Sequence, residues 1–140
     1  MFKIPDTQQR TAPKELIQLA KNHANDILTS IRGINYVMLC STDGLELAAV
    51  HKKSNYNSTK LAAVSSSILA MISAFLNEIN LTGCQSITFD AENGKAILTS
   101  IPAPHHPMIL VTLSNKDVLL GQLLYSLKQV SNALIHADST

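Results

Sequence analysis

The sequence has no tryptophan, only 4% aromatic residues and only 15% charged residues. Without large aromatic side chains, the core must be built mainly from Leu, Ile, Val and Ala. The 140 residues are enough for one such core but not for two. A typical soluble domain has roughly 25% charged residues. A chain with so little charge has difficulty covering its own surface, which favours a second subunit.

The few charges form no one-sided cluster. The formal net charge is +1, and the basic residues are scattered singly apart from Lys52-Lys53. No basic stripe can replace the counterions of a phosphate backbone, so we expect no nucleic-acid partner. The segment Met1–Asp6 breaks before the apolar run of a signal peptide forms. No stretch approaches the roughly 20 apolar residues of a membrane span. We therefore expect a cytoplasmic protein without a membrane span.

Hydrophobic periodicity and turn residues predict three helices and five strands. Residues 1–12 are mixed and polar, so we expect a flexible N-terminal tail followed by a single domain over 13–140. The predicted order is helix 13–32, strands 34–41 and 45–51, helix 57–81, strands 86–90, 95–101 and 108–113, and helix 118–136.

Local signals mark the ends of these elements. Gly33 and Gly83 are expected to end the first helix and the long second helix. The pair Asp43-Gly44 predicts a hairpin with a type I′ turn, because both positions accept positive φ, and Asn93-Gly94 predicts a second hairpin. Ser114–Asp117 has the S-x-x-D form of a capping box, which predicts that the last helix opens there.

The faces of the strands predict the order of the sheet. Strand 34–41 is apolar on both faces, with Val37 and Leu39 facing one way and a second set facing the other: Ile34, Tyr36, Met38 and Cys40. Strand 108–113 is also apolar on both faces, so these two strands are central. Strands 45–51 and 86–90 carry polar residues on one face and belong at the edges. Hairpin pairing then gives the strand order 2-1-5-4-3. We predict an α/β (α+β) fold of three α/β/α layers around a five-stranded, mainly antiparallel sheet.

The long helix has two contrasting sides when it is drawn at 100° per residue. The large apolar residues make one broad face, which we expect to pack on the sheet: Leu61, Val64, Ile68, Met71, Ile72, Phe75 and Ile79. The opposite side carries only small or uncharged residues: Ala63, Ser66, Ser67, Ala70, Ser73, Ala74 and Asn77. Small residues let a second helix approach closely, so we predict a homodimer in which this helix packs against its own copy. The alternative is a weakly polar face that contacts solvent.

The edge strand 86–90 supports the same prediction. Its sequence, Ser86-Ile87-Thr88-Phe89-Asp90, has its only charge at the end and so lacks the usual protection against pairing. Pairing with the same strand of a second copy would add Ser86, Thr88 and Asp90 to the dimer interface. The alternative is that the chain's own tail covers this edge.

Three segments resemble the Roadblock/LC7 family, over roughly Leu16 to Leu134. They are Tyr36–Ala48, similar to the family's strand–S-x-D-G–strand opening, Lys60–Leu69 at the start of the long helix, and Leu119-Leu120-Gly121, where Gly121 permits close packing. The resemblance implies a homodimer with paired long helices and one sheet through both subunits. It also implies a scaffold or regulatory role, with a small Ras-like GTPase as partner.

Residues that could perform chemistry are few. No G-x-x-x-x-G-K-[ST] segment is present to bind nucleotide phosphates, and Ser65–Ser67 lie in mid-helix without a partner base. The adjacent His105 and His106, in a Pro-His-His-Pro loop that matches no feature of the family, cannot easily bind one metal ion together. Cys40 and Cys84 lack any CxxC neighbour and are interpreted as reduced core thiols. We expect no enzyme activity, no catalytic or metal-binding residues and no cofactor.

Two further expectations concern function. Only Arg10 and Arg32 could supply an arginine finger, so any stimulation of GTP hydrolysis is expected to act by repositioning the GTPase's own residues. The alternative function is a small-molecule sensor of the PAS or profilin-like type, because a five-stranded sheet with flanking helices can enclose a ligand pocket. That reading predicts a concave site with convergent polar groups.

Overall fold

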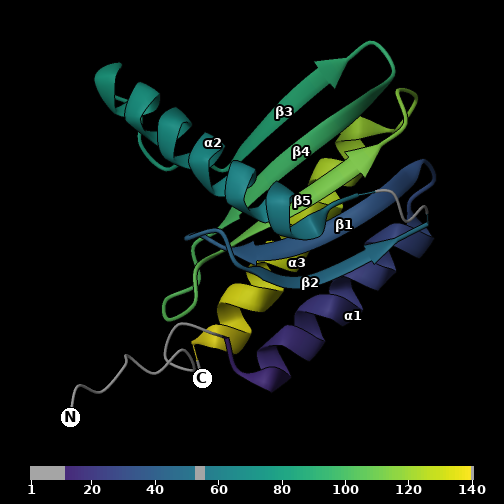
Figure 1. Ribbon diagram of the computed structural model, residues 1–140, viewed down its shortest axis with the longest axis horizontal. Helices are drawn as coiled ribbons and strands as arrows, with labels where there is room; N and C mark the ends of the chain where they lie inside the picture. The colour runs from purple at the N-terminus through teal and green to yellow at the C-terminus, as the bar shows by residue number, and fades with distance from the viewer. Residues whose placement is uncertain (1–11, 53–55, 140) are drawn as a thin grey trace.

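The computed structural model describes residues 12–52 and 56–139, which form three helices and five strands in the predicted order (Figure 1). They are α1 (Lys14–Ser30), β1 (Ile34–Ser41), β2 (Glu46–His51), α2 (Ser58–Glu78), β3 (Ser86–Ala91), β4 (Gly94–Ile101), β5 (Met108–Ser114) and α3 (Leu120–Asp138). The strands form one antiparallel sheet in the order β2-β1-β5-β4-β3. The predicted fold class and strand order are confirmed.

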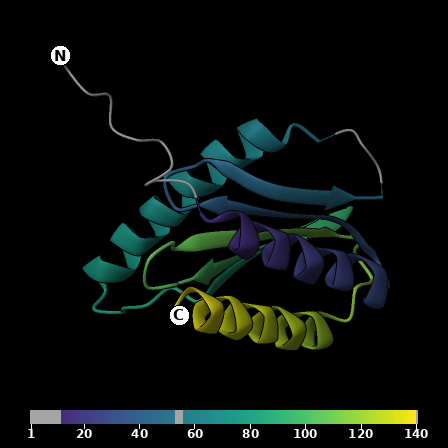
Figure 2. The same ribbon diagram turned by 90° about the horizontal axis from the view of Figure 1, so that it is seen from below.

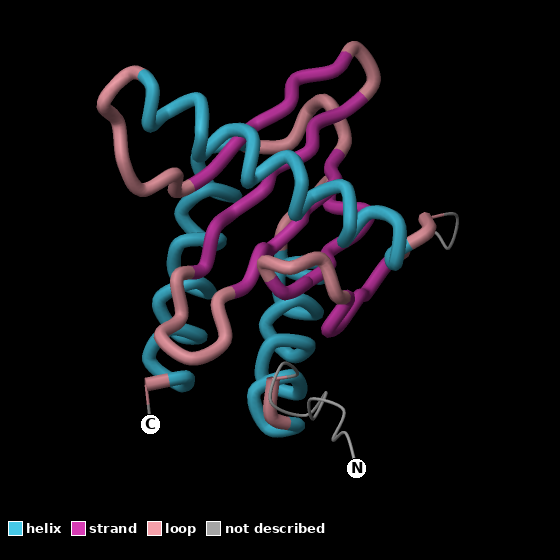
Figure 3. Tube along the Cα trace, turned by 60° about the vertical axis from the view of Figure 1, so that its left-hand side comes forward, coloured by secondary structure: helices cyan, strands magenta, loops and turns pink. Residues whose placement is uncertain are grey.

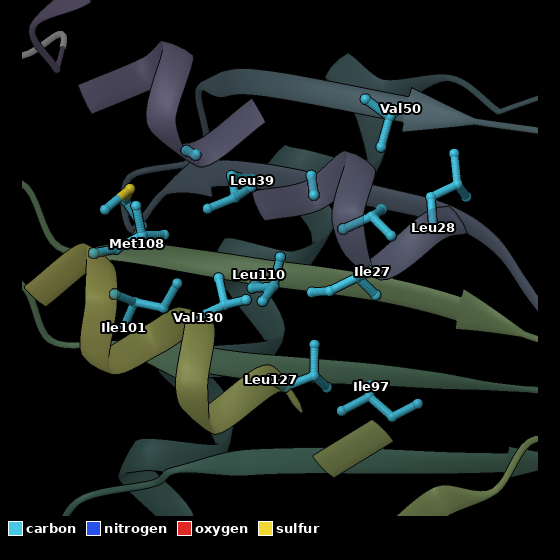
Figure 4. Close-up of a cluster of buried hydrophobic side chains, with 14 of the residues drawn as sticks. Ile27, Leu28, Leu39, Val50, Ile97, Ile101, Met108, Leu110, Leu127 and Val130 are labelled. Carbon is cyan, nitrogen blue, oxygen red and sulfur yellow. The ribbon is translucent and has the colours of Figure 1, made fainter. Parts of the chain in front are cut away.

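The helices cover both faces of the sheet. Figure 2 shows α1 and α3 side by side on one face and α2 alone on the other. The larger core lies under α1 and α3, where Ile27 and Leu127 pack over Leu39, Leu110 and Ile97 of the sheet (Figure 4). The smaller core, under α2, contains Tyr36, Met38, Cys40, Ala62, Leu98, Ile109 and Val111. The domain therefore has the three layers that the strand patterns predict.

The start of β1 departs from the predicted alternation. Ile34 lies opposite Ser114 and Tyr36 lies opposite Leu113, so Asn35 is an extra residue in the ladder. A bulge of one residue shifts the side chains that precede it to the other face. Ile34 accordingly packs in the core under α1 and α3, and the prediction that it shares a face with Tyr36 is wrong.

The ends of α2 are fixed by two different caps. The sequence left the cap open between Asn57 and Ser58, and the structure has it at Asn57, whose side-chain oxygen accepts a hydrogen bond from the Lys60 N–H at 3.1 Å. The helix ends earlier than predicted, at Glu78, and the left-handed residue that follows its C-terminus is Asn80, with φ +62, rather than Gly83. There the Leu81 N–H donates to the Leu76 carbonyl at 2.8 Å, in the pattern of a Schellman motif.

The β1–β2 hairpin is confirmed, but its turn is not of type I′. Of the two turn residues, only Gly44 has positive φ, at +93, and its N–H donates to the Ser41 carbonyl at 3.0 Å. The pairing shifts by one residue between Leu39 and Cys40, which marks a bulge in the hairpin.

Two predictions about the start of α3 are wrong. Ser114 is the last residue of β5 and its hydroxyl donates to the Asn115 carbonyl, so it caps no helix. The helix begins at Leu120 after Leu119, without a side-chain cap. Gly121 is exposed and has open space around the position of a Cβ atom, so it does not serve close packing.

The second hairpin is confirmed, with Ala91 opposite Gly94. Gly94 starts β4, where an added Cβ would lie 2.7 Å from the Ser114 carbonyl oxygen. Residues 1–11 of the predicted tail lie outside the described residues. Ala12, the last residue of that predicted tail, is buried in the larger core.

The length and composition of α2 correct one expectation. Its 21 residues are apolar enough to cross a membrane on those two criteria. The prediction that no stretch approaches a membrane span is therefore wrong for this helix. Figure 3 shows the same helix running across the strands of the sheet, with its C-terminal end beyond the start of β3.

Candidate interaction surface on α2 and β3

The N-terminal half of α2 is fixed to the sheet. The hydroxyl groups of Tyr36 and Ser58 form a hydrogen bond of 2.5 Å, and Ser66 donates to the Thr42 carbonyl at 2.5 Å. Ala62 and Ser65 are the buried residues of the helix, and α2 packs against β1, β2 and β5. The Schellman motif fixes the other end, so both ends of the helix are held by hydrogen bonds while only part of its surface is covered.

The apolar residues of α2 are not all directed at the sheet. Leu61, Ile68 and Ile72 are half-buried, whereas Val64, Met71, Phe75 and Ile79 are between 45% and 64% exposed. The prediction that all seven pack on the sheet is wrong for these four. On the helical wheel Leu76, Leu69 and Ala62 extend these seven residues to an apolar arc of about 180°, and a sheet covers little more than about 100° of a helix. The width of the arc was the signal that part of it had to face elsewhere.

The predicted small-residue side lies next to this exposed apolar stripe. Six of its seven members are exposed: Ala63, Ser67, Ala70, Ser73, Ala74 and Asn77. Ser66 is half-buried and uses its hydroxyl within the chain. Together the two sides form one uncharged surface, called here the α2 surface: Val64, Ser67, Ala70, Met71, Ala74, Phe75 and Ile79.

The β3 strand adds an open sheet edge beside α2 (Figure 1). Within the described residues β3 pairs with β4 alone, and Ser86, Thr88 and Asp90 are all exposed. Phe89, on the α2 face of the sheet, is also exposed. The Lys95 ammonium lies 2.6 Å from the Asp90 carboxylate, and this hydrogen bond and charge lower the pKa of Asp90. The edge is therefore open and carries no free charge on its own strand, as an edge that pairs with another strand requires.

The predicted interface residues of both elements lie at the surface, and the interface itself remains a prediction.

The His105-His106 loop has a partner that the sequence did not reveal. The Asp138 carboxylate accepts hydrogen bonds from the N–H groups of His105 and His106 at 2.7 and 2.8 Å, and its second oxygen lies 2.7 Å from His106 Nδ1. Burial raises the pKa of Asp138, but the hydrogen bonds from His106 and His105 outweigh it and leave the pKa below its usual value. The loop is thus fastened to the end of α3 by a residue 32 positions away in sequence.

The two cysteines and the possible metal ligands form no reactive group in the part of the chain that the structure describes. Cys40 and Cys84 are free thiols, and burial raises the pKa of Cys40 to about 12. Cys84 is half-buried after α2, so its predicted place in the core is wrong. Within residues 12–52 and 56–139, no three His, Cys, Asp or Glu residues are grouped as metal ligands would be.

Comparisons with known proteins agree with this arrangement. A sequence model described as Roadblock/LC7 domain matches residues 22–112, which is more than half of the chain. Among curated proteins, none matches the sequence. Three solved structures of gliding protein MglB are similar in fold. The Thermus thermophilus protein is 16% identical, with 98% of each chain covered and a TM-score of 0.81. The Myxococcus xanthus protein is 14% identical, with 91% of this chain and 92% of that chain covered and a TM-score of 0.80. A third, described as MglB with tetrameric arrangement, is 16% identical, with 98% of each chain covered and a TM-score of 0.81.

Proposed function

The chain belongs to the Roadblock/LC7 family, and from this premise we propose that it is a homodimeric, non-catalytic regulatory module of the cytoplasm that binds a small Ras-like GTPase. The observation that carries the proposal is the α2 surface, an exposed and uncharged face of the helix beside the open edge of β3. Exposed apolar surface of this kind, next to an unpaired edge, is typical of a protein interface.

A second copy of the chain is the occupant that fits this surface best. A two-fold axis places each patch against itself, so a patch with charges of one sign would meet like charges. No charged residue lies between Lys60 and Glu78, so the α2 surface meets its own copy without repulsion. Ala70 and Ala74 allow the helices to approach, and the apolar side chains of Met71 and Phe75 then fill the space beside them. The tetrameric arrangement of a similar MglB supports self-association of this fold.

The GTPase is proposed as the partner of the paired helices. Support comes from the family resemblance of the sequence and from the similarity in fold to the MglB proteins. Arg10 lies outside the described residues, and exposed Arg32 follows α1, in the layer on the far side of the sheet from α2. Arg32 is therefore not placed beside the α2 surface. We expect the module to act on the GTPase's own switch residues rather than by inserting an arginine.

The proposal is tested by retention of the source organism's Ras-like GTPases on the immobilised protein. We expect retention with a non-hydrolysable GTP analogue and not with GDP, for the wild type and for Arg32→Ala. Ala70→Glu places a charge in the proposed dimer interface. It should abolish retention of the GTPase, because a charge buried without a partner is strongly unfavourable and prevents the helices from pairing. Tyr125→Ala, on α3, is the control.

Two results would contradict parts of this proposal separately. Retention with neither nucleotide would remove the GTPase as partner, and equal retention with both would remove the preference for its GTP form; either result leaves the dimer untouched. If Arg32→Ala kept binding and dimerisation but lost all stimulation of hydrolysis, the protein would act by an arginine finger after all.

A further inference from the structure

A concave site lies on the opposite face of the sheet from α2. It is a cavity of about 350 Å³ between α3 and the adjoining parts of β3 and β4. Leu124, Leu127 and Ile135 of α3 form an apolar wall. Figure 4 shows Leu127 projecting from α3 toward the sheet near Ile97. A volume at the small end of the usual range for ligand pockets favours a small molecule over a protein segment.

The sheet side of this cavity contains a hydroxyl group without a partner. Thr99 lines the cavity, is 7% exposed, and its Oγ1 has no hydrogen-bond partner within the described residues. A buried hydroxyl without a partner lowers stability unless something else satisfies it. Rotation about χ1 exchanges the methyl and hydroxyl groups of a threonine, and so can direct Oγ1 into the cavity. Ser131, 8% exposed, lines the α3 side with a second hydroxyl.

The charge around the cavity has one sign. Among the described residues that line it, Lys128 is the only charged one, and none is Asp or Glu. The ion pairs of the described residues join Lys95 to Asp90 and His106 to Asp138, so Lys128 has no carboxylate partner there. Lys128 and Ser131 are three residues apart on α3 and therefore share a face of the helix.

We propose that this cavity is a binding site for a small organic carboxylate with an apolar body. The carboxylate accepts hydrogen bonds from the Lys128 ammonium and from the hydroxyl groups of Ser131 and Thr99. The apolar body lies against Leu124, Leu127 and Ile135. The site is built from one chain on the face away from α2, so it goes beyond the proposed function and does not depend on the GTPase. Ser86, which lines the cavity, also belongs to the predicted dimer interface.

The test is a titration of the ¹⁵N-labelled full chain with sodium benzoate, followed by two-dimensional NMR. Benzamide, which has the same shape without the charge, is the matched ligand. We expect saturable shifts confined to residues 85–86, 99–102 and 124–135, with a Kd of about 1 mM, the usual scale for a ligand of this size. Benzamide should bind at least about tenfold more weakly, because a hydrogen bond to a charged group is the stronger one. No saturable shift at the cavity, or equal affinity for both ligands, would overturn the proposal.

Variants assign the roles of the individual residues. Lys128→Gln should weaken benzoate binding about tenfold and leave benzamide unchanged, whereas Lys60→Gln on α2 should change neither. Thr99→Val keeps the shape of the side chain and removes the unpaired hydroxyl. It should weaken benzoate binding several-fold without lowering the melting temperature, because no hydrogen bond of the free protein is lost. Unchanged benzoate affinity in Lys128→Gln would show that the cavity does not select an anion.

Discussion

Truncation of Phe75 in the middle of the α2 surface should weaken the dimer strongly. Phe75 is 59% exposed in the single chain, and full burial of such a side chain is worth about 2 kcal/mol. If the dimer buries the exposed part, each copy contributes about 1.2 kcal/mol, and the two copies of a symmetric interface contribute about 2.4 kcal/mol. Because about 1.4 kcal/mol is a tenfold change in affinity, Phe75→Ala should raise the dimer dissociation constant roughly 50-fold.

Sedimentation velocity over a dilution series measures this constant directly. Tyr125→Ala is the matched control, since Tyr125 is an aromatic residue that is 67% exposed on α3, on the far side of the sheet. It should leave the dissociation constant unchanged. Equal dissociation constants for the wild type and Phe75→Ala would refute the placement of the interface on the α2 surface. Equal weakening by both variants would refute the reasoning from exposed area.

Three further predictions concern stability and reactivity. Asp138→Asn should lower the free energy of unfolding by about 2 kcal/mol, because the carboxylate accepts several hydrogen bonds from the His106 loop. The pKa of Asp138 is lowered in the folded state, so this contribution to stability is present above about pH 4 and is lost as the pH falls further. In urea unfolding, the difference in the free energy of unfolding between wild type and variant should therefore be smaller at pH 3 than at pH 7. Gly94→Ala should lower the free energy of unfolding by about 1–3 kcal/mol in the same assay, because its Cβ would lie 2.7 Å from the carbonyl oxygen of Ser114, the last residue of β5. An unchanged free energy of unfolding would mean that β4 and β5 separate easily there. Cys40 should react with a thiol reagent only on unfolding, because it is buried and its pKa is raised to about 12, and rapid labelling of Cys40 in the native protein would contradict that placement.

The order of the elements could be predicted because each rests on a local pattern with a clear period. The two-faced apolar strands around Leu39 and Leu110 require cover on both sides, and that requirement placed β1 and β5 at the centre. Hairpin geometry then left one arrangement of the other strands. The family resemblance pointed to the same fold, and the match over residues 22–112 confirms the family.

The errors share a physical cause, which is that tertiary contacts decided between local alternatives. Nothing in the sequence marks Asn35 as a bulge, because the ladder with β5 determines where the extra residue is placed. Ser114 has the form of a helix cap, but the sheet extends far enough to include it. The turn that follows α2 has a left-handed residue that is not glycine, Asn80, although Gly83 follows three positions later.

The candidate surface could be predicted only in part. The exposed small residues around Ala70 were found because they lack charge, whereas Met71 and Phe75 were assigned to the sheet because they are large and apolar. A single chain offers the helix only one covering surface, and the part of the arc left exposed becomes visible once the sheet is placed. Asp138 was missed because its contacts with the loop join residues that are distant in sequence.

The central claim is that two copies of this chain pack through α2. Multi-angle light scattering of the wild type and of Ala70→Glu tests it most directly. We predict a wild-type mass of twice 15.2 kDa and a variant mass of 15.2 kDa, with unchanged helix content by circular dichroism. A wild type at 15.2 kDa would contradict the dimer, and a dimer that Ala70→Glu leaves intact would show that the subunits meet on another surface.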